Sequence, residues 1–353
     1  MSNPRAGVRA TLVVVGFRHP GIVDAVRAAL ASAPPDSVDV RIMLNGRDPQ
    51  VRAAVEARDF PATVIESEHN LGFGAAVNTL ARDASTDYLV LLNDDAIARP
   101  AWLATLIATA DELTDAGAVS SRLVFPDGRL QEAGGRINPN GHPEQVGHGH
   151  PDNDPALHVR GDVDYASAAA LLVRRAAFEQ IGGFDERFFP AYFEDVDLSL
   201  RLRRAGWRVV YEPDAVIEHL QGTSSSRLTA DAAYAYNRQI FLRKFSFDGS
   251  QRIEGPDTSP ISLEPDHSIT TGGGVGQAWQ AYAAWLAWLN EDTAEDLAAS
   301  RTTVLNLEHE VRVLKGVSER LQAEIDAIHR SATWRAGRVL VAPAAAMRHA
   351  RPR

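Results

Sequence analysis

Two adjacent carboxylates, Asp94 and Asp95, follow an apolar run at residues 88–92. A run of this length, rich in Leu and Val, is typical of a central strand in a parallel sheet. Open α/β sheets bind ligands at the carboxyl ends of their strands. Adjacent carboxylates repel each other unless a cation or a donor lies between them, and a divalent metal that holds a substrate phosphate is the simplest candidate. In the structural alternative, Asp95 caps a helix that begins near Pro100.

A glycine-rich turn precedes a predicted helix at residues 74–83. Gly72 and Gly74 follow a short predicted strand. Glycine lets the backbone approach a ligand closely, and the N–H groups of a helix start point outward. Steric need explains such glycines equally well, so the turn has a ligand-binding and a purely structural interpretation.

Acidic residues open another predicted helix, at residues 195–205. Glu194, Asp195 and Asp197 can each stabilise a first helical turn by about 0.3–1 kcal/mol through the helix dipole, which is the structural interpretation. Glu194 and Asp197 share one helix face, whereas Asp195 points about a quarter-turn away. One carboxylate aimed into a cleft is what a general base requires.

His219 ends the last predicted strand and can act as a third metal ligand beside the acidic pair, although a lone histidine is usually structural. Residues 125–164, rich in Gly, Pro, His and Asp, are predicted to form long loops. The histidines of this segment match no compact metal motif, so a second metal site is the weaker interpretation. They are His142, His148, His150 and His158.

The elements that position these residues alternate between strand and helix. Strands are predicted at residues 11–16, 38–44, 62–66, 88–94, 163–173, 207–211 and 215–219. Helices are predicted at residues 21–32, 49–58, 74–83, 174–181 and 195–205, with another beginning at Pro100. This order indicates an α/β fold with a mainly parallel sheet and right-handed crossovers.

The composition bounds the class of protein. The chain has 353 residues, of which 45% are hydrophobic and 23% charged, as in a globular protein with a sizeable core. The absence of cysteine excludes disulfides and thiolate sites. A net charge of -10 argues against a nucleic-acid partner. The N-terminus lacks the apolar segment of a signal peptide and no run is long enough to span a bilayer, so we expect a cytoplasmic protein.

The C-terminal third differs in composition. Residues 246–278 are predicted to be a Gly/Pro/Ser-rich linker, and residues 279–330 a helical segment with a coiled-coil seam. The seam predicts a parallel homodimer, and its alternative is a helix folded back on its own domain. Residues 331–353 form a basic tail, which we expect to contact an anionic membrane at the inner face of the cell membrane; the alternative is a tail that is solvated or packs against another subunit. The seam residues are Val304, Leu307, Val311, Leu314, Ser318, Leu321, Ile325 and Ile328.

These groups of residues occur together, in this order, in a known family. Over residues 10–245 the chain resembles the family 2 glycosyltransferases with the GT-A fold, a Rossmann-like α/β domain. It is most similar to bacterial rhamnosyltransferase-like enzymes of O-antigen, capsule and cell-wall assembly. The matching segments are residues 70–78, 92–95, 163–173, 181–186, 190–198, 205–211 and 217–219.

The resemblance implies roles for the acidic groups and the histidine. Asp95, with Asp94 beside it, matches the motif that binds the metal and the sugar nucleotide, and His219 matches the third ligand of Mn²⁺ or Mg²⁺. Asp195 matches the catalytic base and Glu194 its acidic neighbour. The implied reaction is an inverting transfer of a sugar such as rhamnose from a dTDP- or UDP-sugar to a glycan or lipid-linked glycan.

The resemblance also implies that a second set of residues lines the nucleotide. One position departs from the family, because Leu44 stands where an aspartate usually reads the base, so the contact cannot distinguish uridine from thymidine. The implied nucleotide-lining residues are Asn45, Asn70, Gly72, Gly74 and Asn78.

Two alternatives stay open. A sugar nucleotidyltransferase would need a Gly-rich phosphate loop with Lys or Arg after the first strand, and residues 16–21 match this poorly. A non-catalytic sugar-nucleotide binder would not need all of Asp95, Asp195 and His219.

Overall fold

The computed structural model describes residues 7–220 and 227–247, and for residues 227–232 the backbone only. The predicted coiled-coil segment, the basic tail and nearly all of the predicted linker lie outside the described residues, and so does the predicted dimer interface. Of the helices in the described part, none combines the length and the apolar character that a bilayer-spanning helix needs.

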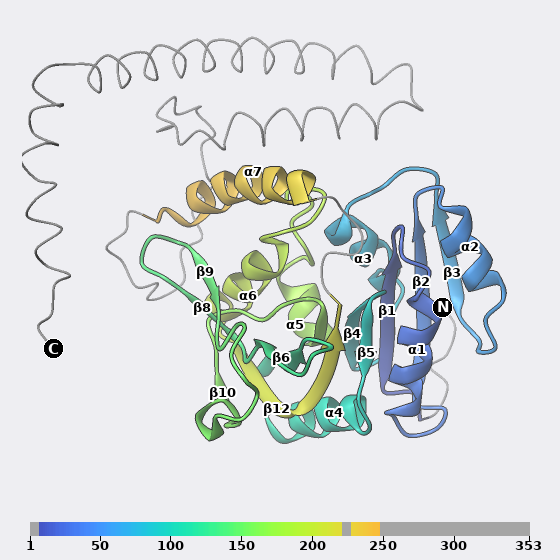
Figure 1. Cartoon of the computed structure of the whole chain (residues 1–353), viewed down its shortest axis with the longest axis horizontal. Coiled ribbons are helices and arrows are strands. Elements are labelled where there is room, and N and C mark those ends of the chain that lie inside the picture. The colour runs from blue at the N-terminus through green and yellow to red at the C-terminus, as the bar shows by residue number, and fades with distance from the viewer. Residues whose placement is uncertain (1–6, 221–226, 248–353) are drawn as a thin grey trace, which may run out of the picture. The chain divides into compact units, whose positions relative to one another are not determined.

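A ten-stranded sheet runs through the described residues (Figure 1). Its main order is β10-β12-β6-β11-β4-β1-β2-β3, with β5 paired to β12 and β7 paired to β6, while β8 and β9 form a separate two-stranded sheet. The strands are β1 (Ala10–Gly16), β2 (Val38–Asn45), β3 (Thr63–Ser67), β4 (Tyr88–Asn93), β5 (Ala96–Ala98), β6 (Ala116–Val124), β7 (Leu130–Glu132), β8 (Gly135–Ile137), β9 (Pro143–Gln145), β10 (Gly161–Asp162), β11 (Ala170–Arg174) and β12 (Arg208–His219).

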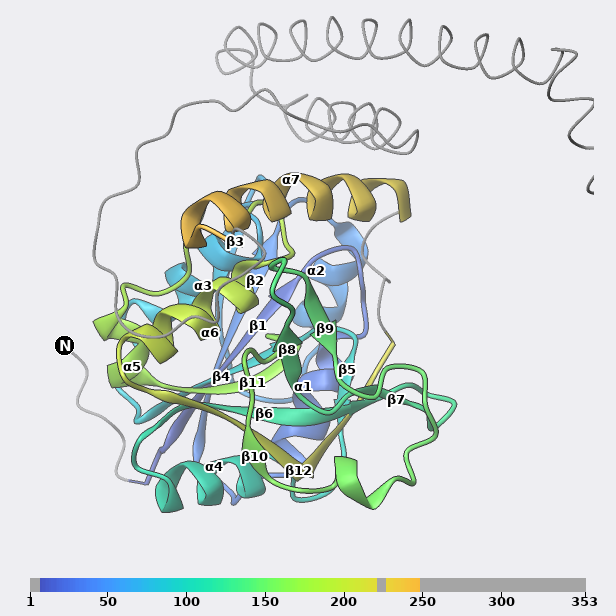
Figure 2. The same cartoon turned by 90° about the vertical axis from the view of Figure 1, so that its left-hand side faces the viewer.

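The first four long strands form the parallel half of the sheet. β1 pairs in parallel with β2 and β4, and β2 pairs in parallel with β3, which confirms the predicted alternation of strand and helix. β11 runs antiparallel to both β4 and β6, whereas β12 is parallel to β6 (Figure 2). Because β11 runs antiparallel to its neighbour β4, the N-terminal end of β11 lies beside the carboxyl end of β4.

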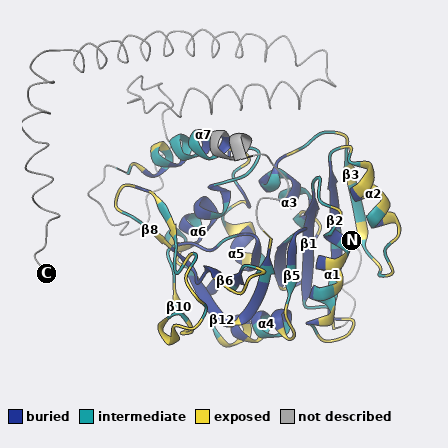
Figure 3. Cartoon of the chain, viewed as in Figure 1, coloured by how far each residue is buried: buried dark blue, intermediate teal, exposed yellow. Residues whose placement is uncertain are grey.

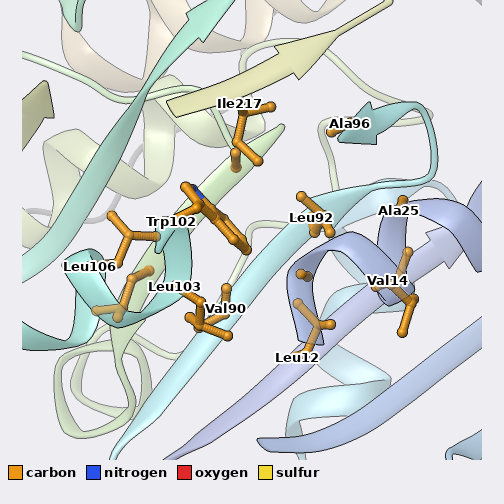
Figure 4. Close-up of a cluster of buried hydrophobic side chains, with 14 of the residues drawn as sticks. Leu12, Val14, Ala25, Val90, Leu92, Ala96, Trp102, Leu103, Leu106 and Ile217 are labelled. Carbon is orange, nitrogen blue, oxygen red and sulfur yellow. The ribbon is translucent and has the colours of Figure 1, made fainter. Parts of the chain in front are cut away.

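Helices cover both faces of this sheet. Leu12 and Val14 of β1 pack toward α1, α2 and α4, whereas Val13 and Val15 pack toward α3, α5 and α6. This alternation buries both faces of the strand, as the continuous apolar runs predict; each buried Leu or Val contributes roughly 1.5–3 kcal/mol. Figure 3 shows the strands buried between the helices, and Figure 4 shows the α1–α4 side of the core. The helices are α1 (Ile22–Ala31), α2 (Pro49–Glu56), α3 (Phe73–Ala81), α4 (Trp102–Glu112), α5 (Arg175–Gln180), α6 (Glu194–Arg204) and α7 (Arg227–Phe245), with a 3₁₀ turn at Pro155–Leu157.

The structure corrects three details of the sequence prediction. β11 begins at Ala170, not at residue 163. The two strands expected at residues 207–211 and 215–219 are one strand, β12, with a register shift between Glu212 and Val216. Pro213 lies in this irregularity, where its missing N–H breaks no ladder bond. The loops expected at residues 125–164 contain β7 to β10, which are too short to give a periodic signal.

Helix α7 has no counterpart in the sequence prediction. Its buried residues recur every fourth position, at Ala233, Asn237, Phe241 and Phe245. An asparagine at the centre of this face hides the amphipathic pattern. The two phenylalanines pack into a cluster with Phe193 and with residues of α6, so α7 lies across α6 in both views (Figures 1 and 2).

Candidate active site

Asp95 and His219 meet where β4 and β12 end. β5 pairs antiparallel with β12, and Ala96 lies opposite His219, so the two strands place Asp95 beside the histidine. Nε2 of His219 lies 3.0 Å from Oδ1 of Asp95, and both side chains are buried. The structure therefore brings these two candidate residues into contact.

Gln131 fixes the orientation of His219. Nδ1 of His219 lies 3.0 Å from Oε1 of Gln131, a buried residue of β7. An amide oxygen only accepts hydrogen bonds, so Nδ1 donates to Gln131, and a metal held beside Asp95 would be bound through the lone pair of Nε2. The amide nitrogen of Asn93 lies 3.3 Å from the same Nε2. The sequence contains no motif that identifies Gln131, because β7 is a three-residue strand inside a loop-rich segment.

Asp94 faces the loop after β1 instead. Its Oδ2 accepts a hydrogen bond from the backbone N–H of Phe17 at 2.9 Å, and Nδ1 of His19 lies 3.1 Å from its backbone oxygen. Burial raises the pKa of Asp94 to about 8, and the charge of Asp95 adds to the rise. The loop at residues 17–19 is thus part of the site, although the sequence prediction did not include it.

The capping alternative for Asp95 finds no support in the placement of α4. This helix begins at Trp102 with Ala101 as its N-cap residue, and β5 lies between it and Asp95. Capping of α4 therefore does not explain why the acidic pair lies at the strand end.

Two protein ligands, Asp95 and His219, are available for a metal. Among residues 7–220 and 227–247, no three His, Asp or Glu side chains are grouped so that they could hold a metal ion by themselves. A hard divalent cation commonly uses one or two protein carboxylates and takes its other ligands from substrate phosphates and water. The pair fits that mode of binding and not a site built from protein ligands alone.

Asp195 lies at the start of α6, across from the same strand end. Its carboxylate accepts hydrogen bonds from the N–H of Val196 at 2.8 Å and of Ala168 at 3.3 Å. The next residue, Ala169, accepts a hydrogen bond from the N–H of Asn93 at 2.9 Å. One short stretch of backbone thus links Asp195 to the end of β4, where the Asp95–His219 pair lies.

The three acids of this helical turn differ in environment. Asp195 is partly exposed, whereas Glu194 and Asp197 are buried. Asp197 pairs with Arg201 at 2.7 Å and with Lys244 of α7 at 2.5 Å. Burial raises the pKa of Asp195; burial and the neighbouring charge of Asp195 raise the pKa of Glu194 well above its usual range. Asp195 is therefore the acid of this turn that can reach a ligand.

The turn before α3 is held by two asparagines. Oδ1 of Asn70 accepts from the amide of Asn45 and from the N–H of Gly72, both at 2.8 Å, and Leu71 donates to Oδ1 of Asn45 at 2.7 Å. Gly72 has a φ of 78°, and a Cβ there would lie 2.7 Å from the ring of Phe189. The glycine thus has a steric reason to be present.

Gly74 and Asn78 face the loop before α6. A Cβ on Gly74 would lie 3.1 Å from Cβ of Phe184. The Asn78 amide donates to the oxygen of Phe184 at 2.9 Å and to Glu186 at 3.0 Å, and its Oδ1 accepts from the N–H of Phe184. These contacts hold the loop that leads toward α6, so the two residues act on the site through that loop.

The loop histidines contact different partners. His158 lies 2.9 Å from Asp152, and Nδ1 of His148 lies 3.0 Å from the backbone oxygen of Gln131. Nδ1 of His142 lies 3.4 Å from the hydroxyl of Tyr234.

Comparisons with known proteins identify the family of the chain. The model of the family described as "Glycosyltransferase like family 2" matches residues 7–234. An N-acetylglucosaminyl-diphospho-decaprenol L-rhamnosyltransferase of Mycobacterium tuberculosis is 31% identical over 237 residues, which cover 61% of this chain and 77% of that protein. The O-antigen biosynthesis protein RfbC of Myxococcus xanthus is 34% identical over 187 residues, which cover 51% of this chain but 14% of that protein.

Solved structures show the fold shared at low identity. GalNAc-T7 with UDP, GalNAc and Mn²⁺ aligns with a TM-score of 0.54 at 13% identity, over 84% of this chain and 58% of that one. The mannosyltransferase PcManGT of Pyrobaculum calidifontis, in complex with GDP-Man and Mn²⁺, aligns with a TM-score of 0.50 at 15% identity, over 96% of this chain and 86% of that one. The fold is therefore the GT-A-like α/β fold that the sequence predicts. Since the family match covers well over half of the chain, the protein belongs to the family 2 glycosyltransferases and is a glycosyltransferase.

Proposed function

We propose that the protein is an inverting, metal-dependent glycosyltransferase that moves a sugar from a nucleoside diphosphate sugar to a hydroxyl of a glycan or lipid-linked glycan. The observation that carries the proposal is Asp195, a partly exposed carboxylate linked through Ala168 and Ala169 to the strand end where Asp95 and His219 meet. Direct displacement needs a base on one side of the anomeric carbon and charge neutralisation on the other.

Asp95 and His219 are the residues that would hold the metal against the donor diphosphate. When bound, the metal neutralises the charge of the departing nucleoside diphosphate. The solved relatives of the same fold that contain Mn²⁺ support this choice. Asn45 and Asn70 would shape the donor side, since their contacts fix the turn at residues 70–72.

Asp195 would act as the general base. As the acceptor oxygen bonds to the anomeric carbon, its proton moves to a carboxylate oxygen of Asp195. The bond between that carbon and the diphosphate oxygen breaks, and the nucleoside diphosphate leaves with the electron pair. One displacement of this kind inverts the anomeric configuration. Burial raises the pKa of Asp195, which suits a carboxylate that must accept a proton near neutral pH.

The substrates to test first come from the M. tuberculosis relative. Its name states transfer of L-rhamnose to N-acetylglucosaminyl-diphospho-decaprenol. We therefore propose dTDP- and UDP-linked sugars, with rhamnose first, as donors, and an acceptor that presents N-acetylglucosamine.

Asp195→Asn tests the assignment of the base. Removing a general base typically costs about 10²–10⁴-fold in rate, whereas donor binding should stay close to wild type. Asp162→Asn, which changes a surface carboxylate of β10, serves as the control. Transfer by the Asp195→Asn variant at a rate near that of the wild type would refute the assignment, and product NMR that shows a retained anomeric configuration would refute the displacement.

Chelation tests the metal. With excess EDTA we expect both transfer and donor binding to be lost, and Asp95→Ala and His219→Ala should each weaken the Mn²⁺-dependent part of donor binding. Full activity in EDTA would contradict the proposal.

A further inference from the structure

A cluster of part-exposed rings lies beside Asp195. It consists of Tyr192 before α6, Tyr234 on α7 and His142 in the turn between β8 and β9, and we refer to these three residues as the aromatic cluster. The ring centroids of Tyr192 and Tyr234 are 6.2 Å apart at 67°, and the Tyr234 hydroxyl lies 3.4 Å from Nδ1 of His142. Three segments that are distant in the sequence thus converge at one place.

The cluster has a buried floor and an accessible upper layer. Phe193 and Phe241 are buried, with ring centroids 5.2 Å apart, and Tyr234 packs on Phe193 at 4.8 Å. Tyr192 and Tyr234 are half-buried and His142 is exposed. A core needs apolar rings only, whereas this cluster carries two phenols and an imidazole at its surface. Such rings combine an apolar face with a polar edge.

The aromatic cluster adjoins the proposed base. Phe193, its floor, is the N-cap residue of α6 and directly precedes Glu194 and Asp195. Burial raises the pKa of Tyr234; the charge of Arg238 opposes the rise and that of Asp195 adds to it. Asp195 accepts a hydrogen bond from Ala168, which lies on the side of the metal-binding pair. The aromatic cluster is contributed by other elements, α7 and the β8–β9 turn.

The backbone under the cluster is held in an unfavourable conformation. Tyr192 and Phe193 have φ values of 81° and 70°, and such residues cost about 1–3 kcal/mol each unless their surroundings fix them. The amide of Asn237, a buried residue of α7, donates to the backbone oxygens of Ala191 at 2.9 Å and Tyr192 at 3.0 Å. Helix α7 therefore keeps the rings and the base in one arrangement.

We propose that the aromatic cluster is the subsite for the acceptor sugar. A pyranose has an apolar C–H face and a rim of hydroxyls, which match a ring face and the polar edges of tyrosine and histidine. A sugar seated on Tyr192 and Tyr234 would present a hydroxyl to Asp195, on the side away from the donor diphosphate. This inference rests on the proposed function and adds the residues that choose the acceptor.

Tyr234→Ala in the full-length protein tests the subsite. We expect the acceptor KM to rise by about 10-fold or more, while donor affinity and the rate of donor hydrolysis without acceptor stay within about two-fold of wild type. Tyr234→Phe keeps the ring face and should recover most of the loss. Tyr236→Ala removes a tyrosine two positions further along α7, which projects from another side of the helix, and should leave the acceptor KM unchanged.

A binding measurement separates this inference from the proposed function. Saturation-transfer NMR with methyl glycosides of N-acetylglucosamine, rhamnose and galactose reports contact with a sugar even without turnover. A signal that the Tyr234→Ala substitution abolishes, and that Tyr236→Ala leaves intact, supports the subsite even if the assignment of the base is wrong. An unchanged acceptor KM in the Tyr234→Ala variant, an equal loss of donor binding, or no sugar signal with the wild type would overturn it.

Discussion

Replacing Gln131 with leucine tests whether this side chain sets the tautomer of His219. The two side chains are buried and 3.0 Å apart, so leucine leaves the proton on Nδ1 without an acceptor. An unsatisfied buried donor costs about 1–3 kcal/mol. The ring can avoid that cost by moving its proton to Nε2, which then donates to Asp95 and has no lone pair left for the metal. At about 1.4 kcal/mol per factor of ten, Mn²⁺ affinity should fall by roughly 5–140-fold.

Calorimetric titration of Mn²⁺ with UDP or dTDP present measures this loss without depending on turnover. Gln131→Glu keeps an accepting oxygen, so its Mn²⁺ affinity should stay within a few-fold of wild type. Gln145→Leu removes another glutamine of the same region, which bonds to Glu132 and not to His219, and should leave the affinity unchanged. A folded Gln131→Leu variant with wild-type Mn²⁺ affinity would refute the reasoning, and so would an equal loss in both leucine variants.

Three further predictions concern stability and assembly. Lys244→Met should lower the free energy of unfolding in urea by about 3 kcal/mol, because it leaves the buried Asp197 one cation short and also removes a partner of Asp185. Arg187→Met removes a half-exposed guanidinium from the same Asp185 and should cost under about 1 kcal/mol, and equal losses would contradict this. Burial raises the pKa of Glu132 to about 7, so the native state keeps a proton that the unfolded state loses above pH 4.5. Wild-type stability should therefore fall between about pH 4.5 and 7 relative to Glu132→Gln, and a constant difference would refute it. Light scattering should report a dimer for the full chain and a smaller species for a chain that ends at Phe247; a full-length monomer would rule out the dimer.

The sequence was sufficient to predict the meeting of Asp95 and His219. Asp95 follows a long apolar run and His219 ends a predicted strand, and strand ends are where α/β folds gather polar groups. The pattern could not show that a short strand, β5, returns along β12 and brings the two residues into contact. A three-residue strand has no period to detect, and the same holds for β7, which carries Gln131.

The roles of the asparagines were harder to predict, because a side-chain amide serves a ligand or the backbone equally well. The side chains of Asn45 and Asn78 form hydrogen bonds with loop backbone of the protein. The side chain of Asn237 binds the strained turn at Ala191 and Tyr192, which lies 45 residues or more away in sequence. Each contact joins segments that no local pattern connects. Helix α7 was not predicted because Asn237, at the centre of its buried face, is polar and interrupts the apolar pattern.

The phase of α6 decides which of its acids can react. Residues three apart share a helix face, so Glu194 and Asp197 turn inward together and Asp195 stays accessible. The inward pair has two different outcomes. Asp197 meets two cations, whereas Oε2 of Glu194 has no hydrogen-bond partner in the described part of the chain, and burial together with the charge of Asp195 raises the pKa of Glu194. The left-handed conformation of Phe193 sets the residue at which the helix begins. A start one residue later would rotate the acids by about 100° and bury the proposed base, so the strained turn that Asn237 holds is what makes Asp195, and not its neighbours, available to a substrate.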